Sequence, residues 1–139
     1  MQWIFFALLS ALFAALVGIF GKVGIKGIDS TLATSVRAVV MAVFLVLVSL
    51  MLGKAKLLHT IENRVLFFIV LSGVAGALSW LFYFFALKTG PVSAVAALDR
   101  LSVVFVLIVA AIFLGEQLTW KTGLGGVLIT AGAILITLK

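Results

Sequence analysis

The chain has 139 residues, of which 65% are hydrophobic and only 10% are charged. Soluble globular domains are nearer about 45–50% apolar and about 25% charged. A soluble fold of this length could not bury so much apolar surface, so the composition excludes a soluble domain and predicts an integral membrane protein. The net charge is +6, and cysteine is absent, which excludes disulfides and thiolate metal sites.

Five apolar runs, each long enough to cross a bilayer, follow one another along the chain. A spanning helix needs roughly 20 apolar residues to cross a hydrocarbon core of about 30 Å. The runs are apolar all round and lack the strict alternation of a membrane β-barrel, so we expect an all-α fold. The expected transmembrane helices cover residues 2–21, 30–52, 65–87, 91–114 and 120–138 of one domain, 1–139.

The residues that bound these helices favour the same division. The first helix carries no charge and is not preceded by the basic segment of a signal peptide, so we expect it to be retained. Asp29 can cap the start of the second helix, and Thr119 can cap the fifth. Pro91 suits the first turn of the fourth helix, where its missing N–H costs nothing. The connecting segments are short, which leaves no room for a soluble domain.

The basic residues outside the helices are divided evenly between the two faces of the membrane. With five helices the termini lie on opposite faces. The N-terminal side then carries Lys54, Lys56, Arg64 and Lys121, and the other side carries Lys22, Lys26, Lys88 and Lys139. A balanced count does not specify an orientation. Either the chain inserts both ways and pairs antiparallel with itself, or the three basic residues between the second and third helices set one weakly preferred orientation.

Three charged residues, Arg37, Asp99 and Arg100, lie inside the apolar spans. Such charges are costly and are usually paired or placed on a polar pathway. Arg37 and Asp99 each lie roughly 10 Å below the same face, at about 1.5 Å per residue from the starts of their helices. They therefore predict an ion pair or hydrogen bond between the second and fourth helices. Arg100 points about 100° away from Asp99, so it needs another partner, a lipid headgroup or a ligand.

Two aromatic residues of the third helix, Trp80 and Tyr83, lie near the same level. Aromatic rings beside Arg and Asp can line a vestibule. The rings bind apolar or cationic groups of a solute, and the charged side chains bind its polar end. We therefore predict a substrate pathway or gate formed by Arg37, Asp99, Trp80, Tyr83 and Arg100. The alternative is a static ion pair with the rings facing lipid. A cavity at the membrane centre would be lined by Ser10, Met41, Gly76 and Ser102, none of which ionises.

Small residues on the last helix form one stripe, which consists of Gly126, Thr130, Ala133 and Thr137. Membrane helices associate where small residues allow their backbones to approach closely. The stripe therefore predicts either helix packing within the monomer or a dimer seam. A terminal helix has more freedom to face outward, which favours the dimer seam.

The sequence does not predict an enzyme, a metal site or a cofactor. The sole histidine, His59, lies in a polar loop with no second metal ligand at a suitable spacing. No serine has an adjacent base and orienting acid, so nucleophilic hydrolysis has no support. No glycine-rich loop follows a strand, which leaves nucleotide binding without support as well.

The most distinctive segment is residues 86–96 (ALKTGPVSAVA), followed by 114–119 (LGEQLT) and a glycine-rich last helix. Together with Arg37-Ala38 and residues 80–86, their order and spacing resemble the EamA domain of the drug/metabolite transporter superfamily. The chain is most similar in plan to the five-helix, single-domain members called bacterial/archaeal transporters. The resemblance covers essentially the whole chain.

The resemblance implies a half-transporter unit and a secondary transporter of small organic solutes, of the metabolite or drug exporter type, in the inner (plasma) membrane. Larger relatives join two such domains, inverted relative to each other, around a central cavity. A lone domain then needs a partner, most simply a second copy, so we expect a homodimer that works by alternating access. Many relatives have a proline where residues 99–102 stand here, so no substrate site is carried over there. The rival hypothesis is a non-transporting assembly or regulatory subunit with this fold.

Overall fold

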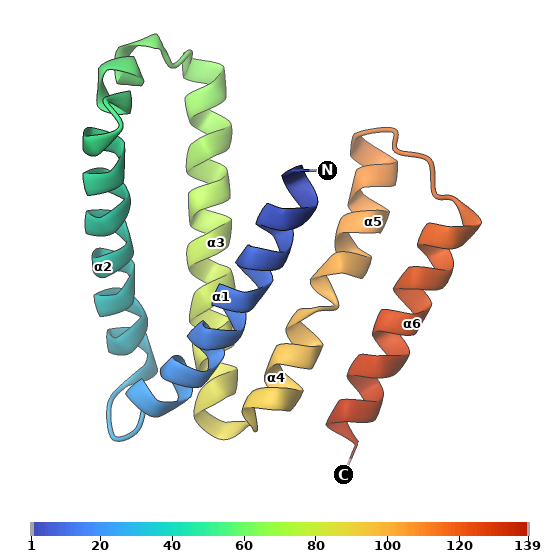
Figure 1. The fold of residues 1–139 in the computed structure, drawn as a ribbon. Coiled ribbons are helices and arrows are strands. Elements are labelled where there is room, and N and C mark those ends of the chain that lie inside the picture. Colours follow the sequence, from blue (N-terminus) through green and yellow to red (C-terminus); the bar gives the residue numbers. More distant parts are fainter. Residues whose placement is uncertain (1, 139) are drawn as a thin grey trace. The chain divides into compact units, whose positions relative to one another are not determined.

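The computed structural model describes residues 2–138 of the chain, and these residues form helices and no strand. The elements are α1 (Gln2–Gly24), α2 (Ser30–Met51), the 3-10 helix η1 (Lys54–Thr60), α3 (Asn63–Thr89), α4 (Val92–Asp99), α5 (Ser102–Phe113) and α6 (Trp120–Thr137) (Figure 1). Five spans are long and apolar enough to cross a membrane when α4 and α5 are counted as one. The expected all-α membrane fold is confirmed. Met1, at the start of the expected domain, and Lys139, one of the counted loop charges, lie outside the described residues.

The fourth span, Val92–Phe113, is interrupted where the sequence predicts one continuous helix. α4 ends at Asp99 and α5 begins at Ser102. Between them the N–H of Arg100 donates to the carbonyl of Ala97 at 3.2 Å, and that of Leu101 to the carbonyl of Leu98 at 3.0 Å. These bonds reach back three residues instead of four, which is the tighter 3-10 pattern. Neither proline nor glycine lies at this point, so the usual sequence signals of a break are absent.

The chain divides into two compact units, residues 1–23 with 89–139 and residues 24–88. Apart from residues at their boundaries, the first unit contains α1, α4, α5 and α6, and the second contains α2, η1 and α3. The helices of each unit are held by different contacts.

The second unit is an antiparallel pair of helices, α2 and α3, joined by η1 (Figure 1). Asp29 caps α2, because its carboxylate accepts hydrogen bonds from the N–H groups of Thr31 at 2.8 Å and Leu32 at 3.0 Å. These bonds, that from Leu32 foremost, hold the pKa of the Asp29 carboxyl below its ordinary value. Gly53 follows α2 with a φ of 66°, a left-handed conformation that lets the chain turn into η1.

The first unit is held by close packing of α6 against α4 and α5. Gly126 is buried, and a Cβ added there would meet a methyl carbon of Leu107 at 3.5 Å. Ala133, two turns further along α6, is also buried. The ammonium group of Lys22 in α1 donates to the carbonyl of Gly90 at 2.9 Å, which connects the end of α1 to the start of the fourth span. Small residues therefore allow close helix approach here.

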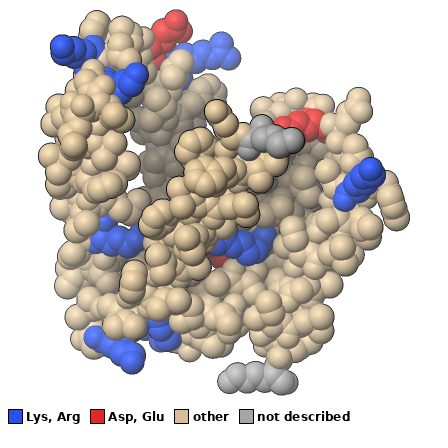
Figure 2. Space-filling model, viewed as in Figure 1, with Lys and Arg blue, Asp and Glu red and all other residues tan. Residues whose placement is uncertain are grey.

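Most of the apolar side chains lie on the surface. In Figure 2 most of the visible surface is neither acidic nor basic, and the Lys and Arg side chains form separate small patches. Large apolar residues such as Phe13, Phe44 and Phe105 are more than half exposed. Such a surface is stable against lipid and not against water. The buried apolar residues are Ile25, Phe84, Leu87, Ala94, Val95, Ala110 and Ala133.

Candidate functional site

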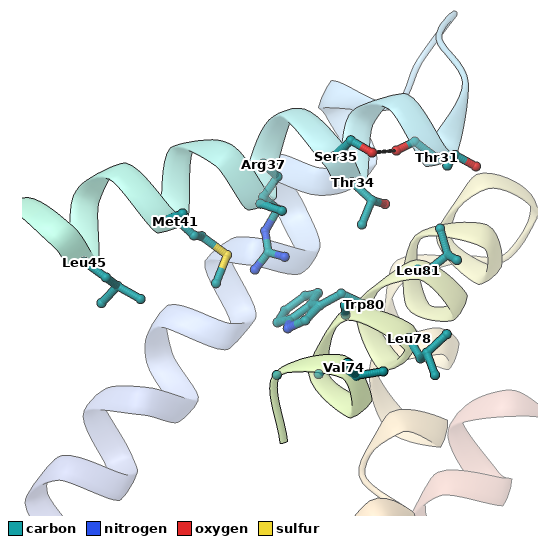
Figure 3. Close-up of a pocket in the computed structure, with 15 residues that line it drawn as sticks. Thr31, Thr34, Ser35, Arg37, Met41, Leu45, Val74, Leu78, Trp80 and Leu81 are labelled. Carbon is teal, nitrogen blue, oxygen red and sulfur yellow. Dashed lines mark hydrogen bonds between the residues drawn. The ribbon is translucent and has the colours of Figure 1, made fainter. Parts of the chain in front are cut away.

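A groove of about 660 Å³ runs between α2 and α3 in the second unit (Figure 3). Its volume falls within the range of about 300–1,000 Å³ that is typical of small-molecule sites. Hydroxyl side chains lie toward the start of α2, and apolar side chains line the rest. The lining residues are Thr31, Thr34, Ser35, Arg37, Ala38, Met41, Ala42, Leu45, Gly73, Val74, Gly76, Ala77, Leu78, Trp80 and Leu81.

The charged group of the groove is the guanidinium of Arg37, which stacks on the ring of Trp80. The central carbon of the guanidinium lies 3.7 Å from the centroid of the Trp80 ring and 5.7 Å from that of Phe84. A cation within about 6 Å of an aromatic centroid is attracted by the ring quadrupole. Figure 3 shows the Arg37 side chain crossing from α2 toward α3, with the indole beneath it. This stacked pair fixes the direction of the cation.

The position of Trp80 is set by the aromatic cluster on α3. Trp80, Tyr83, Phe84 and Leu87 follow the i, i+3, i+4, i+7 spacing of one helix face. The rings of Trp80 and Tyr83 meet edge to face at 5.4 Å, and those of Trp80 and Phe84 lie 6.3 Å apart. Phe84 and Leu87 are buried, and Trp80 and Tyr83 are half-buried. The cluster therefore holds the indole with its face toward Arg37.

Two hydroxyl groups of the groove already donate their protons to the backbone. Thr34 donates to the carbonyl of Ser30 at 2.8 Å, and Ser35 to the carbonyl of Thr31 at 2.9 Å. By contrast, among the described residues of this unit no hydrogen bond or ion pair engages the guanidinium of Arg37 or the indole N–H of Trp80. These two side chains therefore supply donors that point into an apolar groove without an acceptor.

The predicted gate residues fall into both units. Arg37, Trp80 and Tyr83 come together in the second unit, as described. Asp99 and Arg100 belong to the first unit, where they lie at the break between α4 and α5 and are exposed. The side chain of neither residue forms a hydrogen bond or ion pair with another described residue of the first unit. The Arg37–Asp99 ion pair joins residues of different units and stays a prediction.

The four predicted mid-membrane residues are likewise divided. Met41 and Gly76 line the groove on facing helices. A Cβ added at Gly76 would meet no atom within 4 Å, so the groove is open at this point. Ser10 is an exposed residue of α1, and Ser102 is the first residue of α5. One cavity lined by all four residues therefore stays a prediction.

The small-residue stripe on α6 contributes to packing within the first unit. Gly126 and Ala133 are buried, and the hydroxyls of Thr130 and Thr137 donate to their carbonyls at 2.9 Å and 2.7 Å. A groove of about 410 Å³ lies along Gly126 and Thr130 between α5 and α6, but no charged side chain lines it. Burial accounts for Gly126 and Ala133 as packing positions, and a dimer seam along this helix stays a prediction.

The sequence contains a signal for the groove that the prediction of single gate residues missed. Thr31, Thr34, Ser35 and Ala38 recur at i, i+3, i+4 and i+7, so they form one small and polar stripe on α2. This stripe lines the groove together with Arg37. Among residues 2–138, no cluster of three or more histidine or acidic side chains could hold a metal ion.

Comparison with known proteins shows which family the whole chain resembles. The model of a family described as the EamA-like transporter family matches residues 1–138. A relative from Sinorhizobium sp. is 44% identical over 135 residues, which cover 97% of this chain and 96% of the relative. It is named an uncharacterized transporter in the cobO 3' region. No solved structure gives a significant match to the chain.

Proposed function

Since the chain belongs to the EamA-like transporter family and is a multi-pass membrane transporter, we propose that it moves small organic solutes by secondary transport. The transporter in this proposal is of the metabolite or drug exporter type and lies in the inner membrane. The protein catalyses no covalent reaction. The observation that carries the proposal is the groove between α2 and α3, with its cation held on an aromatic ring.

The groove has the properties required of part of a solute path. Its apolar walls accept the body of an organic molecule, and a few polar groups orient it. Arg37 lies roughly 10 Å along α2 from Ser30, so the cation sits within the span instead of at its end. Intramembrane charges usually mark solute or ion pathways.

The working unit in this proposal is a homodimer. One chain of five spans is half of the inverted two-domain plan on which many transporters are built. Alternating access in that plan moves one half against the other. The balanced loop charges permit the second half to be the same chain in the opposite orientation. A twofold axis in the membrane plane would then present one groove toward each face.

Flux measured in proteoliposomes tests the proposal. A panel of radiolabelled organic acids, amino acids and lipophilic dyes is compared for the natural protein, Arg37→Gln and the matched control Arg64→Gln. Both substitutions remove one positive charge from the same unit, but only Arg37 lines the groove. We expect Arg37→Gln to lower flux at least about tenfold and Arg64→Gln to retain it. Folded protein that transports no member of the panel would favour the non-transporting subunit.

A cysteine in the connecting 3-10 helix tests the antiparallel arrangement. The natural chain has no cysteine, so Ala55→Cys in η1 supplies the sole thiol. A membrane-impermeant thiol reagent is applied to one side of sealed vesicles and then to both. Antiparallel dimers predict about half of the thiols labelled from each side. Labelling from one side alone leaves only a parallel dimer or a different partner chain.

A further inference from the structure

The geometry points to a carboxylate as the group that Arg37 and Trp80 receive, so the groove between α2 and α3 takes small organic monoanions with an apolar body. This inference deepens the proposed transport function, on which it rests, by naming the class of solute. Four features of the groove support a carboxylate: the donors that lack acceptors, the direction of the guanidinium, the number of cations, and the shape of the groove.

The N–H donors of Arg37 and Trp80 lack acceptors. The guanidinium carries five N–H groups and the indole one, and within residues 24–88 none of them has an acceptor. The hydroxyls of Thr34 and Ser35 cannot act as further donors, because their protons are held by the carbonyls of Ser30 and Thr31. Unpaired donors in apolar surroundings are costly. An occupant with an anionic oxygen group removes this cost, whereas a cationic occupant would raise it.

The direction of Arg37 favours a solute over a lipid headgroup. An arginine that reaches a headgroup extends along its helix toward the membrane surface. Here the side chain crosses the groove and lies on the Trp80 ring instead of running back toward Thr31 (Figure 3). The stacked face is covered by the indole, so the N–H groups at the edge of the guanidinium remain for binding. An edge of two parallel N–H groups matches the two oxygens of a carboxylate.

The number of cations sets the charge of the occupant. Arg37 is the one Lys or Arg among the residues that line the groove. A dianionic phosphate would leave a charge uncompensated in an apolar groove, whereas a monocarboxylate is neutralised by one guanidinium.

The remaining walls specify the body of the solute. Met41, Leu45, Val74 and Leu78 supply apolar contact beyond the cation. A Cβ added at Gly73 or Gly76 would meet no atom within 4 Å, so the groove has room for a ring or a short chain at this point. The groove is therefore built for a molecule with one charged end and one apolar end.

Binding of a matched set of probes tests the inference without requiring transport. The probes are 3-phenylpropanoate, its neutral amide and the corresponding amine, 3-phenylpropylamine. The protein is Trp3→Phe/Trp120→Phe, which leaves Trp80 as the reporting fluorophore, in nanodiscs of uncharged lipid. We expect the carboxylate to bind at least about tenfold more tightly than the amide, and the amine to bind most weakly. Arg37→Gln should abolish the preference, Arg37→Lys should keep part of it, and Arg64→Gln should leave it unchanged.

Several results would overturn the inference. Equal affinity for carboxylate and amide would show that Arg37 does not receive the anion. A carboxylate preference that emerges only in Asp99→Asn would show that the guanidinium is held in a fixed ion pair. A response of Trp80 to anionic lipid but to none of the probes would assign the groove to lipid. If Arg37→Gln fails to fold, Arg37→Lys is compared with the natural protein instead. A carboxylate preference that is the same in both would then contradict the role of the guanidinium.

The same measurements separate this inference from the proposed function. Carboxylate-selective binding without flux would reject transport and leave the inference standing. Flux of neutral or cationic solutes without carboxylate-selective binding would support transport and reject the inference.

Discussion

The two units of this chain use small residues for opposite purposes. On α6, Gly126 is buried and its Cα faces Leu107 and Val104 of α5. On α3, Gly73 and Gly76 face the groove, and a Cβ added at either would meet no atom within 4 Å. The first arrangement brings helices together, and the second keeps a groove open between them.

This difference distinguishes the unit in which helices pack closely from the unit in which a groove is available for binding. Close helix contact in a membrane is a packing gain, since lipid gives no hydrophobic reward for association. An open groove forgoes that gain, and the donors of Arg37 and Trp80 have no acceptor among residues 24–88. Such a loss is expected where an occupant supplies the missing contacts. Glycines in a helix, as in both α3 and α6, therefore do not by themselves indicate which helices pack.

The largest expected effect is a loss of folded protein when Gly126 is enlarged. Gly126→Leu forces a branched side chain against Leu107, where even a Cβ would lie at 3.5 Å. We expect the free energy of unfolding to fall by about 1–3 kcal/mol or more, as in other overpacked sites. Thermal unfolding in detergent measures it. Gly76→Leu is the matched control and should keep the stability of the natural protein. Equal destabilisation of the two variants would refute the contrast between the units.

The second effect concerns the function of the open groove. Gly76→Leu fills space beside Met41 and Ala77, so solutes with bulky apolar bodies should lose affinity by roughly tenfold. Small solutes should be affected less, because they do not extend as far from Arg37. Flux of a homologous series of solutes measures the discrimination. A uniform loss across the series would indicate that Gly76 affects the protein by another route.

A smaller effect is expected from the stacked pair. Trp80→Phe retains a ring under Arg37 but removes the indole N–H and weakens the cation–π attraction. A change of about 0.5–1 kcal/mol corresponds to a twofold to fivefold loss of solute affinity. Fluorescence of Trp80 is lost in this variant, so isothermal titration with the organic acid is the measurement. Phe82→Leu, on the exposed face of α3, serves as the control. If Trp80→Phe binds the organic acid as tightly as the natural protein does, the indole does not contribute to solute binding.

The smallest effect lies at the start of the second unit. Asp29→Ala removes the acceptor of two N–H groups of α2, so the melting temperature should fall slightly, whereas Asp29→Asn can still cap. The folded-state pKa of Asp29 is lowered, so the carboxylate stabilises the fold above its ordinary pKa. That contribution is lost as the pH falls through the lowered value, below about pH 4. Melting curves across this range should converge for natural protein and Asp29→Ala. Curves separated by the same interval at every pH would contradict this role.

Much of the architecture follows from the sequence because membrane spans obey simple limits of length and hydropathy. The caps at Asp29 and Thr119 follow from the hydrogen bonds that free N–H groups require. The break after Asp99 could not be predicted in the same way. It involves a change from four-residue to three-residue hydrogen bonds in a stretch with no proline or glycine.

The candidate site could be predicted from the sequence only in part. Depth along a helix can be counted from its start, so Arg37, Trp80 and Tyr83 could be placed at one level. Depth does not specify which neighbour a side chain contacts. The sequence suggested a carboxylate as the partner of Arg37, and the structure adds the ring of Trp80, to which arginine is attracted without opposite charge. Contacts of this kind depend on helix rotation, which hydropathy does not encode.

A solute path requires that water and solutes reach the groove between α2 and α3. Ala77→Cys lines the groove, whereas Ala75→Cys lies on the same helix, with the same change of side chain, outside it. The measurement is the rate at which each thiol reacts with a water-soluble methanethiosulfonate in proteoliposomes, with and without 3-phenylpropanoate. The account predicts that Ala77→Cys reacts at least about tenfold faster than Ala75→Cys and is protected by the organic acid. Equal, slow reaction of both thiols would contradict it.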